Sequence, residues 1–444
     1  MKPIKAGLLG LGTVGAGTYH VLQRNQEEIR RRAGRGIEVS MVAVRNVERA
    51  RKIINSGIVG SEVEVVADPF AVVNNPDIDI VVELIGGYDL TRELVLQAIA
   101  NGKHVVTANK ALLALHGNEI FEAAQAKGVM VAFEAAVAGG IPIIKALREG
   151  LSANRIESVA GIINGTTNFI LSEMRDKGLD FNTVLKQAQE LGYAEADPTF
   201  DIEGVDAAHK LTIMSAIAFG IPVQFGSAHI EGISQLQAVD LRYAEQLGYR
   251  IKLLGITRRT TVDGKEGIEL RVHPTLVPGA RLIANVEGAM NAVLVQADAV
   301  GATLYYGKGA GAEPTASAVI ADLIDVTRLA TADPYSRVPH LAFQPTELAD
   351  VPILPMDEIR TSYYLRVTVQ DQLGVMADLT RILADAGISI DAVLQKEPGE
   401  KARTDIVIIT HQTREKYVNA AIAKIESLAT TVGKVVRIRL ESLG

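Results

Sequence analysis

An acidic segment that ends in a single lysine is the part of this sequence best suited to chemistry. It reads LGYAEADPTFDIEGVDAAHKL over 191–211, and six carboxylates, counted from Glu190, precede Lys210. Asp206 and Lys210 are four residues apart on a predicted helix, so both side chains should lie on one face. The sequence turns apolar directly after Lys210, which is typical of a helix that enters a core. An acid and a lysine at the mouth of a buried helix could bind a polar substrate and exchange a proton with it. An exposed ion pair at a helix start is the simpler alternative, because such pairs are common and weak.

A glycine-rich turn near the N-terminus predicts a dinucleotide-binding site. The residues GLGTVG at 10–15 follow a predicted strand over 4–9 and precede a predicted helix. In that setting the glycines permit a tight turn, let the backbone approach a pyrophosphate, and let the helix pack closely on the strand. A glycine turn that binds no nucleotide is the alternative. The residues expected to face the cofactor are Gly10, Gly12, Thr13, Val14 and Gly15.

The end of the second predicted strand, over 38–44, bears on the choice of cofactor. NAD sites usually have Asp or Glu at this point to bind the ribose hydroxyls. Here Arg45 follows the strand, and Arg49 and Arg51 are close by. Arginine suits the 2′-phosphate of NADP, so NADP is favoured over NAD. The alternative is the start of a solvated basic helix.

Two further strand ends should face the same crevice. VVELIGG at 81–87 ends a buried strand in two glycines, and the next strand ends in TANK at 107–110. The carboxyl ends of parallel strands share one edge of the sheet, where ligands bind in open α/β folds. Lys110 could therefore hold a substrate or cofactor group, although a lysine after a strand is equally often exposed.

The loop EAAVAGGIP at 134–142 combines one carboxylate with small residues and glycines. Glu134 and exposed backbone carbonyls could bind a hard cation through oxygen. A hinge between two domains is the alternative.

Two other segments contain glycines at points where strands end. GIINGTTN at 161–168 reads as a strand that runs into a helix cap. GKGAG at 307–311 either admits the nicotinamide end of a cofactor closely or forms a flexible return loop.

The elements that must position these residues divide into three parts. Residues 1–134 alternate apolar strands with amphipathic helices, which is typical of an α/β fold with a doubly wound parallel sheet of the Rossmann type. Residues 135–330 predict an α+β catalytic and dimerisation domain, whose last helix, over 314–330, could return to the first domain. The strands predicted in the first part are 4–9, 38–44, 80–85, 104–107 and 129–133. The second part is predicted to contain helices 142–151, 181–191, 205–219 and 238–247, followed by strands 251–261, 268–272, 292–297 and 303–306.

A proline-rich segment separates the C-terminal part. Residues 331–360 hold five prolines and little periodicity, which predicts an extended linker. Residues 361–444 read as a βαββαβ unit, the ferredoxin-like arrangement. Its predicted elements are strand 364–369, helix 375–386, strand 388–396, a turn at Pro398–Gly399, strand 403–410, helix 414–428 and strand 434–441.

Composition and charge exclude several classes of protein. The chain has 444 residues, of which 48% are hydrophobic, and this suits a globular protein of two or three domains. Its net charge is −7 and it has no long basic run, so we expect neither nucleic acid nor a membrane as a partner. It has no cysteine, which excludes thiol nucleophiles, disulfides and Cys-type metal sites. A reducing, cytoplasmic compartment is expected.

Taken together, these segments resemble homoserine dehydrogenases that carry a C-terminal ACT domain. The resemblance implies the reversible reduction of L-aspartate 4-semialdehyde to L-homoserine with NAD(P)H, a step toward threonine, methionine and isoleucine. We expect no aspartokinase part ahead of the first strand. The matching segments run in the family's order over nearly the whole chain: GLGTVG, ELIGG, TANKALLA, FEAAVAGGIP, GIINGTTNFIL, GYAEADPTFDIEGVDAAHKL and GKGAGAEPTASAV.

The resemblance also assigns roles to residues. It makes Lys210 the group that exchanges the proton accompanying hydride transfer, and it places Lys110 near substrate and cofactor. It implies a sodium site, which replaces the hinge interpretation of the loop at 134–142. The remaining assignments are Glu195, Asp201 and Asp206 for the substrate, Gly192 and Gly307 for the cofactor, and Glu134, Val137, Gly139 and Ile141 for the sodium ion.

The last part resembles an ACT domain, which implies an amino-acid effector. Threonine is the effector implied, bound between paired ACT domains, and the pairing suggests a homo-dimer or homo-tetramer. Asp391 departs from the family pattern, because ACT domains frequently have a ligand-binding Asn there; whether threonine inhibits is left open. The effector residues expected are Asp371, Gly374, Val375 and Asp391.

Two other functions fit parts of the sequence. A dehydrogenase such as aspartate-semialdehyde dehydrogenase needs a cysteine nucleophile, which this chain lacks. A non-enzymatic sensor of nucleotides or amino acids could combine a Rossmann domain with an ACT domain. That function leaves the acidic segment before Lys210 without a role.

Overall fold

The computed structural model describes residues 2–55, 63–395 and 403–443, which form two compact units. The first unit contains Met1–Val159, Ala208–Gly226 and Met290–Asp350, and the second contains Ala160–Ala207, Ser227–Ala289 and Val351–Gly444. Three elements, β7 (Ile156–Ile162), α11 (Val205–Phe219) and the short η3 (Phe225–Ser227), belong partly to each unit. Within the described ranges, no helix has the length and apolarity that a membrane span requires.

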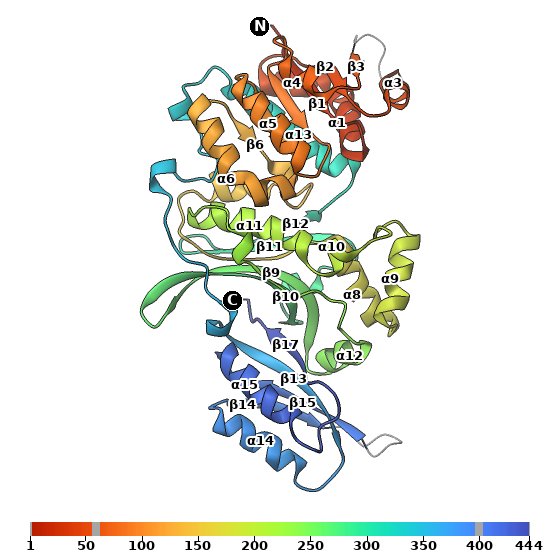
Figure 1. The fold of residues 1–444 in the computed structure, drawn as a ribbon, viewed down its shortest axis with the longest axis vertical. Helices are drawn as coiled ribbons and strands as arrows, with labels where there is room; N and C mark the ends of the chain where they lie inside the picture. Colours follow the sequence, from red (N-terminus) through yellow and green to blue (C-terminus); the bar gives the residue numbers. More distant parts are fainter. Residues whose placement is uncertain (1, 56–62, 396–402, 444) are drawn as a thin grey trace. The chain divides into compact units, whose positions relative to one another are not determined.

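A six-stranded parallel sheet forms the centre of the first unit (Figure 1). Its order, β3-β2-β1-β4-β5-β6, is that of a doubly wound Rossmann sheet and confirms the predicted fold class. β4 ends at Glu83, two residues earlier than predicted, because the Glu83 carboxylate accepts hydrogen bonds from the backbone N–H groups of Ile85 and Gly86. The strands are β1 (Ile4–Leu9), β2 (Ile37–Ala43), β3 (Glu64–Val66), β4 (Ile80–Glu83), β5 (His104–Thr107) and β6 (Val131–Ala132).

Helices cover both faces of this sheet. On one face, α1 and α13 pack together over alternate strand residues such as Ala6 and Leu8. On the other face, α4 contacts β1, and Val72 lies against Gly7. Parallel strands that are buried on both sides need the continuous apolar runs seen in this sequence. The helices are α1 (Thr13–Arg24), α2 (Gln26–Ala33), α3 (Val47–Asn55), α4 (Pro69–Asn74), α5 (Asp89–Ala100), α6 (Lys110–Lys127) and α13 (Ala312–Leu329).

The remaining elements of the first unit include one difference from prediction. The helix expected over 142–151 is a short α-helix that continues as a π-turn, because Leu151 N–H reaches back to the carbonyl of Ala146. The proline-rich segment contains short 3-10 turns. These elements are η1 (Glu134–Ala136), α7 (Ile143–Lys145), η2 (Ala146–Gly150), η3 (Phe225–Ser227), β11 (Met290–Ala297), β12 (Gly301–Lys308), η5 (Pro334–Ser336) and η6 (Pro345–Glu347).

A long antiparallel hairpin runs through the second unit. Figure 1 shows its strands, β9 and β10, as a curved green ribbon. Both strands extend beyond the predicted ranges; β10 is buried over most of its length, and β9 over its first half. The elements around it are α8 (Gly165–Lys177), α9 (Phe181–Glu190), α10 (Thr199–Ile202), β8 (His229–Ile230), α12 (Ala238–Gln246), β9 (Tyr249–Val262), β10 (Lys265–Pro278) and η4 (Leu282–Asn285).

The C-terminal part of the second unit confirms the predicted βαββαβ arrangement. Its strands pair in the antiparallel order β17-β13-β15-β14, and two helices cover one face over a separate apolar core. β17 also pairs in parallel with β10, so this sheet continues into the hairpin. The turn predicted at Pro398–Gly399 lies outside the described residues. The elements are η7 (Met356–Glu358), β13 (Arg360–Gln370), α14 (Val375–Asp385), β14 (Ile390–Gln395), β15 (Arg403–Thr410), β16 (Thr413–Arg414), α15 (Glu415–Glu426) and β17 (Val436–Leu440).

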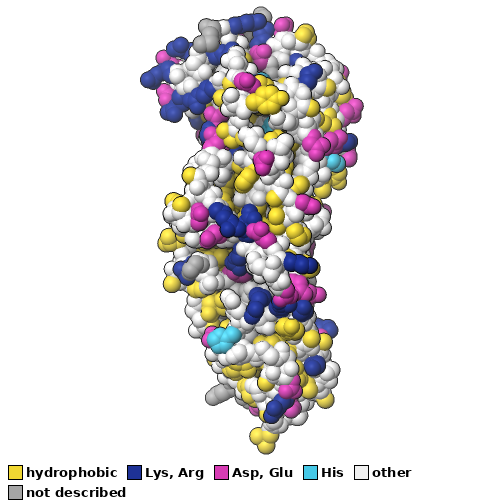
Figure 2. Space-filling model, turned by 90° about the vertical axis from the view of Figure 1, so that its left-hand side faces the viewer, with side chains coloured by type: hydrophobic (Ala, Val, Ile, Leu, Met, Phe, Trp, Pro, Cys, Tyr) yellow, Lys and Arg dark blue, Asp and Glu magenta, His cyan; other side chains and the backbone are white. Residues whose placement is uncertain are grey.

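Exposed charges of both signs are mixed over most of the face drawn in Figure 2. Many form ion pairs, such as the one in which Arg24 of α1 lies 2.8 Å from Glu313 of α13. Both of these side chains are more than half exposed, so the pair adds little to stability.

Candidate active site

The glycine turn after β1 has the geometry that a dinucleotide site requires. Gly10 adopts a left-handed backbone (φ 98°), and a Cβ there would lie 2.8 Å from the carbonyl oxygen of Leu84. Only glycine fits this position. Gly12 caps α1, and Thr13 and Val14 form its first turn, so the helix N-terminus opens next to the turn.

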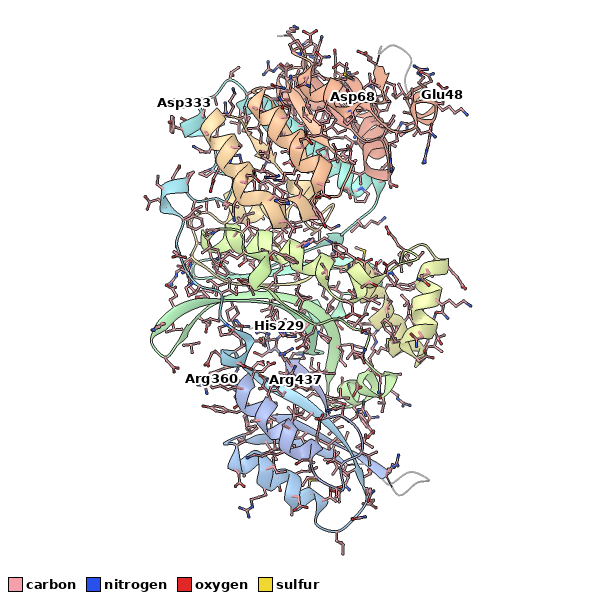
Figure 3. The ribbon with its side chains drawn as sticks, viewed as in Figure 1. Glu48, Asp68, His229, Asp333, Arg360 and Arg437 are labelled. Carbon is pink, nitrogen blue, oxygen red and sulfur yellow. The ribbon has the colours of Figure 1, made fainter. Side chains whose placement is uncertain are left out.

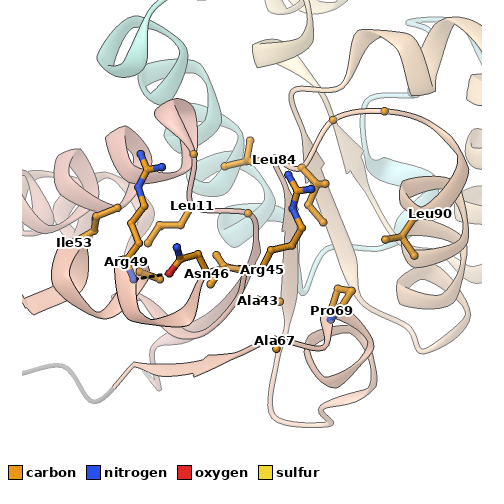
Figure 4. A pocket seen from close by; sticks show the side chains of 17 residues that line it. Leu11, Ala43, Arg45, Asn46, Arg49, Ile53, Ala67, Pro69, Leu84 and Leu90 are labelled. Carbon is orange, nitrogen blue, oxygen red and sulfur yellow. Dashed lines mark hydrogen bonds between the residues drawn. The ribbon is translucent and has the colours of Figure 1, made fainter.

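A cavity of about 650 Å³ lies beside this turn, within the first unit. Its walls come from the ends of β1, β2 and β4 and from the start of α3. Figure 4 shows Arg45 and Arg49 extending in the same direction on either side of Leu11. The backbone N–H of Arg49 donates to the side-chain oxygen of Asn46 (3.0 Å), and Asn46 thereby caps the first turn of α3. The sequence assigns Arg45 to the cofactor and places Arg49 close by without giving it a role; the structure puts Arg45 two residues before α3 and Arg49 in its first turn, and both line the cavity.

A buried network joins the two strand ends predicted to share one edge of the sheet. The Glu83 carboxylate is fully buried and accepts from Ile85 N–H (2.9 Å), Gly86 N–H (3.1 Å) and the Thr107 hydroxyl (2.8 Å). Asn109, which caps α6, donates from its amide to the carbonyl of Gly87 (2.6 Å). Ile85 and Gly86 line the cavity, so Glu83 shapes its wall.

Glu83→Ala is expected to lower the midpoint of thermal unfolding by about 5 °C and to weaken dinucleotide binding, because it leaves three donors without their acceptor. Thermal scans and titration with dinucleotide measure the two effects. Glu93→Ala, at an exposed glutamate on α5, is the matched control and should change neither value. An unchanged midpoint for Glu83→Ala would show that this network does not hold the loop.

The acidic segment is organised by a residue that the sequence did not single out as functional. Asn164 is buried at the start of α8, and its amide donates to Asp201 (2.7 Å) and to Asp206 (2.8 Å). Its side-chain oxygen accepts from Thr167 N–H (2.8 Å) and so caps the helix, as the sequence predicted. One asparagine therefore both caps α8 and holds two carboxylates together.

Lys210 follows one turn after Asp206 on α11. Asp206 is 3% exposed and Lys210 is 9% exposed, so the alternative of an exposed ion pair is wrong. Asp206 lies in the first turn of the helix, where the helix dipole stabilises a carboxylate. The helix then continues with buried apolar residues, as predicted.

A buried lysine fixes the helix that carries Asn164. Lys252 of β9 donates to the carbonyl of Val286 (2.6 Å) and to the side-chain oxygen of Asn168 (3.1 Å), one turn beyond Asn164. Burial lowers the pKa of Lys252 to about 8, although the nearby charge of Glu287 opposes this shift. These bonds hold the first turn of α8 in place.

The other predicted substrate and cofactor residues come from separate elements. Lys110 is the first residue of α6 and is half-buried. Glu195 is exposed between α9 and α10, and its backbone carbonyl accepts from the side-chain amide of Gln189 (3.0 Å). Gly192 ends α9 with a left-handed backbone (φ 76°), and Gly307 lies in β12 opposite Asn291.

The loop predicted to bind a cation is buried and strained. The Glu134 carboxylate accepts from the N–H groups of Ile144 (3.0 Å) and Lys145 (2.7 Å), and burial raises its pKa to about 7 against these bonds. Ala138 has a left-handed backbone (φ 56°), which is unfavourable for a residue with a Cβ. The described residues contain no group of three or more His, Asp or Glu that could hold a metal ion. Val137 and Gly139 flank Ala138, and the carbonyl of Ile141 accepts from Ile143 N–H (2.8 Å).

The predicted effector residues lie at the start of α14 and on β14. Asp371 is exposed in the loop after β13, Gly374 caps α14 and Val375 begins it. Asp391 is half-exposed on β14, 3.8 Å from His411.

Three family models match this chain: the homoserine dehydrogenase NAD binding domain over 10–134, homoserine dehydrogenase over 142–324 and the ACT domain over 363–430. The homoserine dehydrogenase of Pseudomonas aeruginosa is 61% identical, with 100% of both chains covered. The crystal structure of a homoserine dehydrogenase from Thiobacillus denitrificans is 70% identical, covers 100% of this chain and 99% of that one, and gives a TM-score of 0.94. A hyperthermophilic archaeal homoserine dehydrogenase in complex with NADPH is 25% identical, covers 73% of this chain and 98% of that one, and gives a TM-score of 0.62. The Rossmann sheet, the acidic segment and these similarities agree, and the chain belongs to the homoserine dehydrogenase family.

Proposed function

We propose that this chain oxidises L-homoserine reversibly to L-aspartate 4-semialdehyde, with NADP as the preferred cofactor. The observation that carries the proposal is the amide of Asn164, which holds the carboxylates of Asp201 and Asp206 at the start of the helix that carries Lys210. A cluster of this kind suits a small substrate with both an ammonium group and a hydroxyl.

In this proposal the carboxylates bind and Lys210 moves the proton. Asp201 and Asp206, with Glu195, hold the ammonium group of the substrate, because carboxylates accept strong hydrogen bonds from it. In the oxidative direction, neutral Lys210 takes the proton of the C4 hydroxyl as the C4–H bond breaks. In the reductive direction its ammonium group returns that proton to the alkoxide oxygen. Lys110 contributes a second cation near the reacting oxygen.

The glycine turn and cavity of the first unit fit a dinucleotide. When bound, it supplies the hydride acceptor at its nicotinamide ring. Gly10 to Gly15 would hold its pyrophosphate, and Arg45 and Arg49 would bind a 2′-phosphate. Gly192 and Gly307 are assigned to the nicotinamide end. The archaeal relative, whose structure is in complex with NADPH, supports the choice of NADP over NAD.

The loop of Glu134 is proposed to hold a sodium ion through the carbonyls of Val137, Gly139 and Ile141. Because the pKa of Glu134 is raised to about 7, its carboxyl is protonated at pH 5 and ionised at pH 8. A cation binds the ionised carboxylate more tightly than the neutral carboxyl group. Sodium chloride is therefore expected to raise the unfolding temperature, relative to equal choline chloride, at pH 8 and to have little effect at pH 5. Equal effects at the two pH values in thermal scans would contradict the site.

We propose a Rossmann domain over 1–134, a catalytic and dimerisation domain over 135–330, a linker over 331–360 and an ACT domain over 361–444, in a cytoplasmic dimer or tetramer. Threonine is the effector proposed for Asp371, Gly374, Val375 and Asp391.

Homoserine-dependent NADPH formation by the purified full chain tests the function. Turnover with NADP⁺, and slower turnover with NAD⁺, is expected. A sensor would bind nucleotide or threonine in calorimetry but would form no NADPH, and that result would contradict the proposal.

A further inference from the structure

Two strands from distant parts of the sequence follow one another along the same edge of β10. β8 pairs with β10 at Arg271 and Val272, and β17 of the ACT part pairs with it at Thr275 and Leu276. Both run parallel to β10. The residue that follows β8, Glu231, therefore lies near the start of β17.

Two arginines of β17 bind the Glu231 carboxylate. Arg439 donates to it twice (2.8 and 2.9 Å) and Arg437 donates once (3.1 Å). His229 Nε2 lies 2.9 Å from Oε1 of the same carboxylate. Figure 3 labels His229 and Arg437. Burial alone would raise the pKa of Glu231, but His229, Arg439 and Arg437 hold it well below its usual range.

The same two arginines are anchored in the ACT part by a second carboxylate. Arg439 donates from Nε to Glu415 at the start of α15 (2.7 Å), and Arg437 lies 3.0 Å from it. The hydroxyl of Tyr363 on β13 also donates to Glu415 (3.1 Å). Arg439 is only 1% exposed, so breaking this bridge would leave buried charges unpaired. The bridge therefore ties Glu231 rigidly to β13 and α15.

On its other side, Glu231 is directly connected to the acidic segment. The next residue, Gly232, packs directly against the acidic segment: a Cβ on Gly232 would lie 2.4 Å from the carbonyl oxygen of Ile202. Ile233 N–H donates to that carbonyl (2.8 Å). Ile202 stands between Asp201 and Asp206, so a shift of this backbone would move the carboxylates that Asn164 holds.

We infer that Glu231, bridged by Arg437 and Arg439 to Glu415, positions the substrate carboxylates and carries changes in the ACT part to the substrate site. This inference rests on the substrate role proposed for Asp201 and Asp206. Glu231 and both arginines are positioning residues, since they act through the backbone of Ile202 and Gly232. An effector that moves β13 or α15 would weaken or strengthen substrate binding by the same route.

Steady-state kinetics of the full chain test the inference without any effector. Glu231→Gln is expected to raise the homoserine KM about tenfold, while kcat and the NADP⁺ KM stay within about twofold. Arg437→Gln should raise the homoserine KM by less, because Arg439 still donates two hydrogen bonds to Glu231. The double variant should raise it no further than Glu231→Gln alone, because Arg437 acts through Glu231. Arg439→Gln should also raise the homoserine KM. If Arg439→Gln fails to fold because that side chain is buried, Arg437→Gln still tests the bridge, since the Arg437 side chain is partly exposed.

Two matched variants separate the outcomes. Arg381→Gln, at an exposed arginine of α14, should leave every constant unchanged. If Asp206→Asn raises the homoserine KM but Glu231→Gln and Arg437→Gln do not, the bridge is structural only and the inference is overturned alone. Additive effects in the double variant overturn it too. If Asp206→Asn leaves the KM unchanged, the substrate assignment itself fails, and the inference fails with it.

Discussion

Lys210→Met is expected to lower kcat for homoserine oxidation about 10³-fold, a typical contribution of a positioned acid or base. The homoserine KM should stay within about threefold, because the carboxylates of Asp201 and Asp206 remain in place. Met has a similar length and suits the buried position of Lys210, so the variant should fold. Initial rates with NADP⁺ at saturating homoserine measure the loss.

Two comparisons make this result specific. Lys186→Met, at an exposed lysine of α9, should retain full activity. Asp206→Asn should instead raise the homoserine KM, because it weakens the charge that faces the ammonium group. If Lys210→Met kept wild-type kcat, the proton would be handled elsewhere, and Lys110 would become the candidate.

The combined change Arg45→Ala and Arg49→Ala is expected to raise the NADP⁺ KM roughly 10- to 100-fold, since charged hydrogen bonds contribute about 1.5–3 kcal/mol. The NAD⁺ KM should barely change, because NAD⁺ has no 2′-phosphate. Each single variant should have a smaller effect, as both guanidinium groups line the cavity. Kinetics with the two cofactors give the preference directly.

Arg51→Ala is the control for this cofactor prediction. Arg51 lies on the same helix but pairs with Glu48 (3.1 Å) and does not line the cavity. Its loss should leave both cofactor constants unchanged. An unaltered NADP⁺ to NAD⁺ ratio in the variant lacking Arg45 and Arg49 would remove both from cofactor choice.

The sequence predicts the regular part of the fold well, because buried parallel strands need continuous apolar runs that are easy to recognise. It misses β3, whose three residues are too few for any periodicity. It also reads 142–151 as one α-helix, since a π-turn keeps nearly the same apolar pattern. The early end of β4 depends on hydrogen bonds to the Glu83 side chain, and no propensity encodes these.

In the site, too, the sequence predicts local contacts but not contacts between distant residues. Asp206 and Lys210 are close in sequence, so helical spacing alone brings them together. Asn164 binds carboxylates 37 and 42 residues away, so its second role depends on tertiary structure. The bridge from Glu231 to Arg439 spans 208 residues and is invisible to local patterns for the same reason.

Deuterium transfer is the most direct test of hydride chemistry at this site. Homoserine with both C4 hydrogens replaced by deuterium is mixed with NADP⁺ and the full chain, and the mass of the NADPH formed is measured. We expect each NADPH to carry one deuterium from C4, because the substrate hydroxyl gives only its proton to Lys210. NADPH without deuterium, or no NADPH from a folded chain, would contradict direct hydride transfer from homoserine.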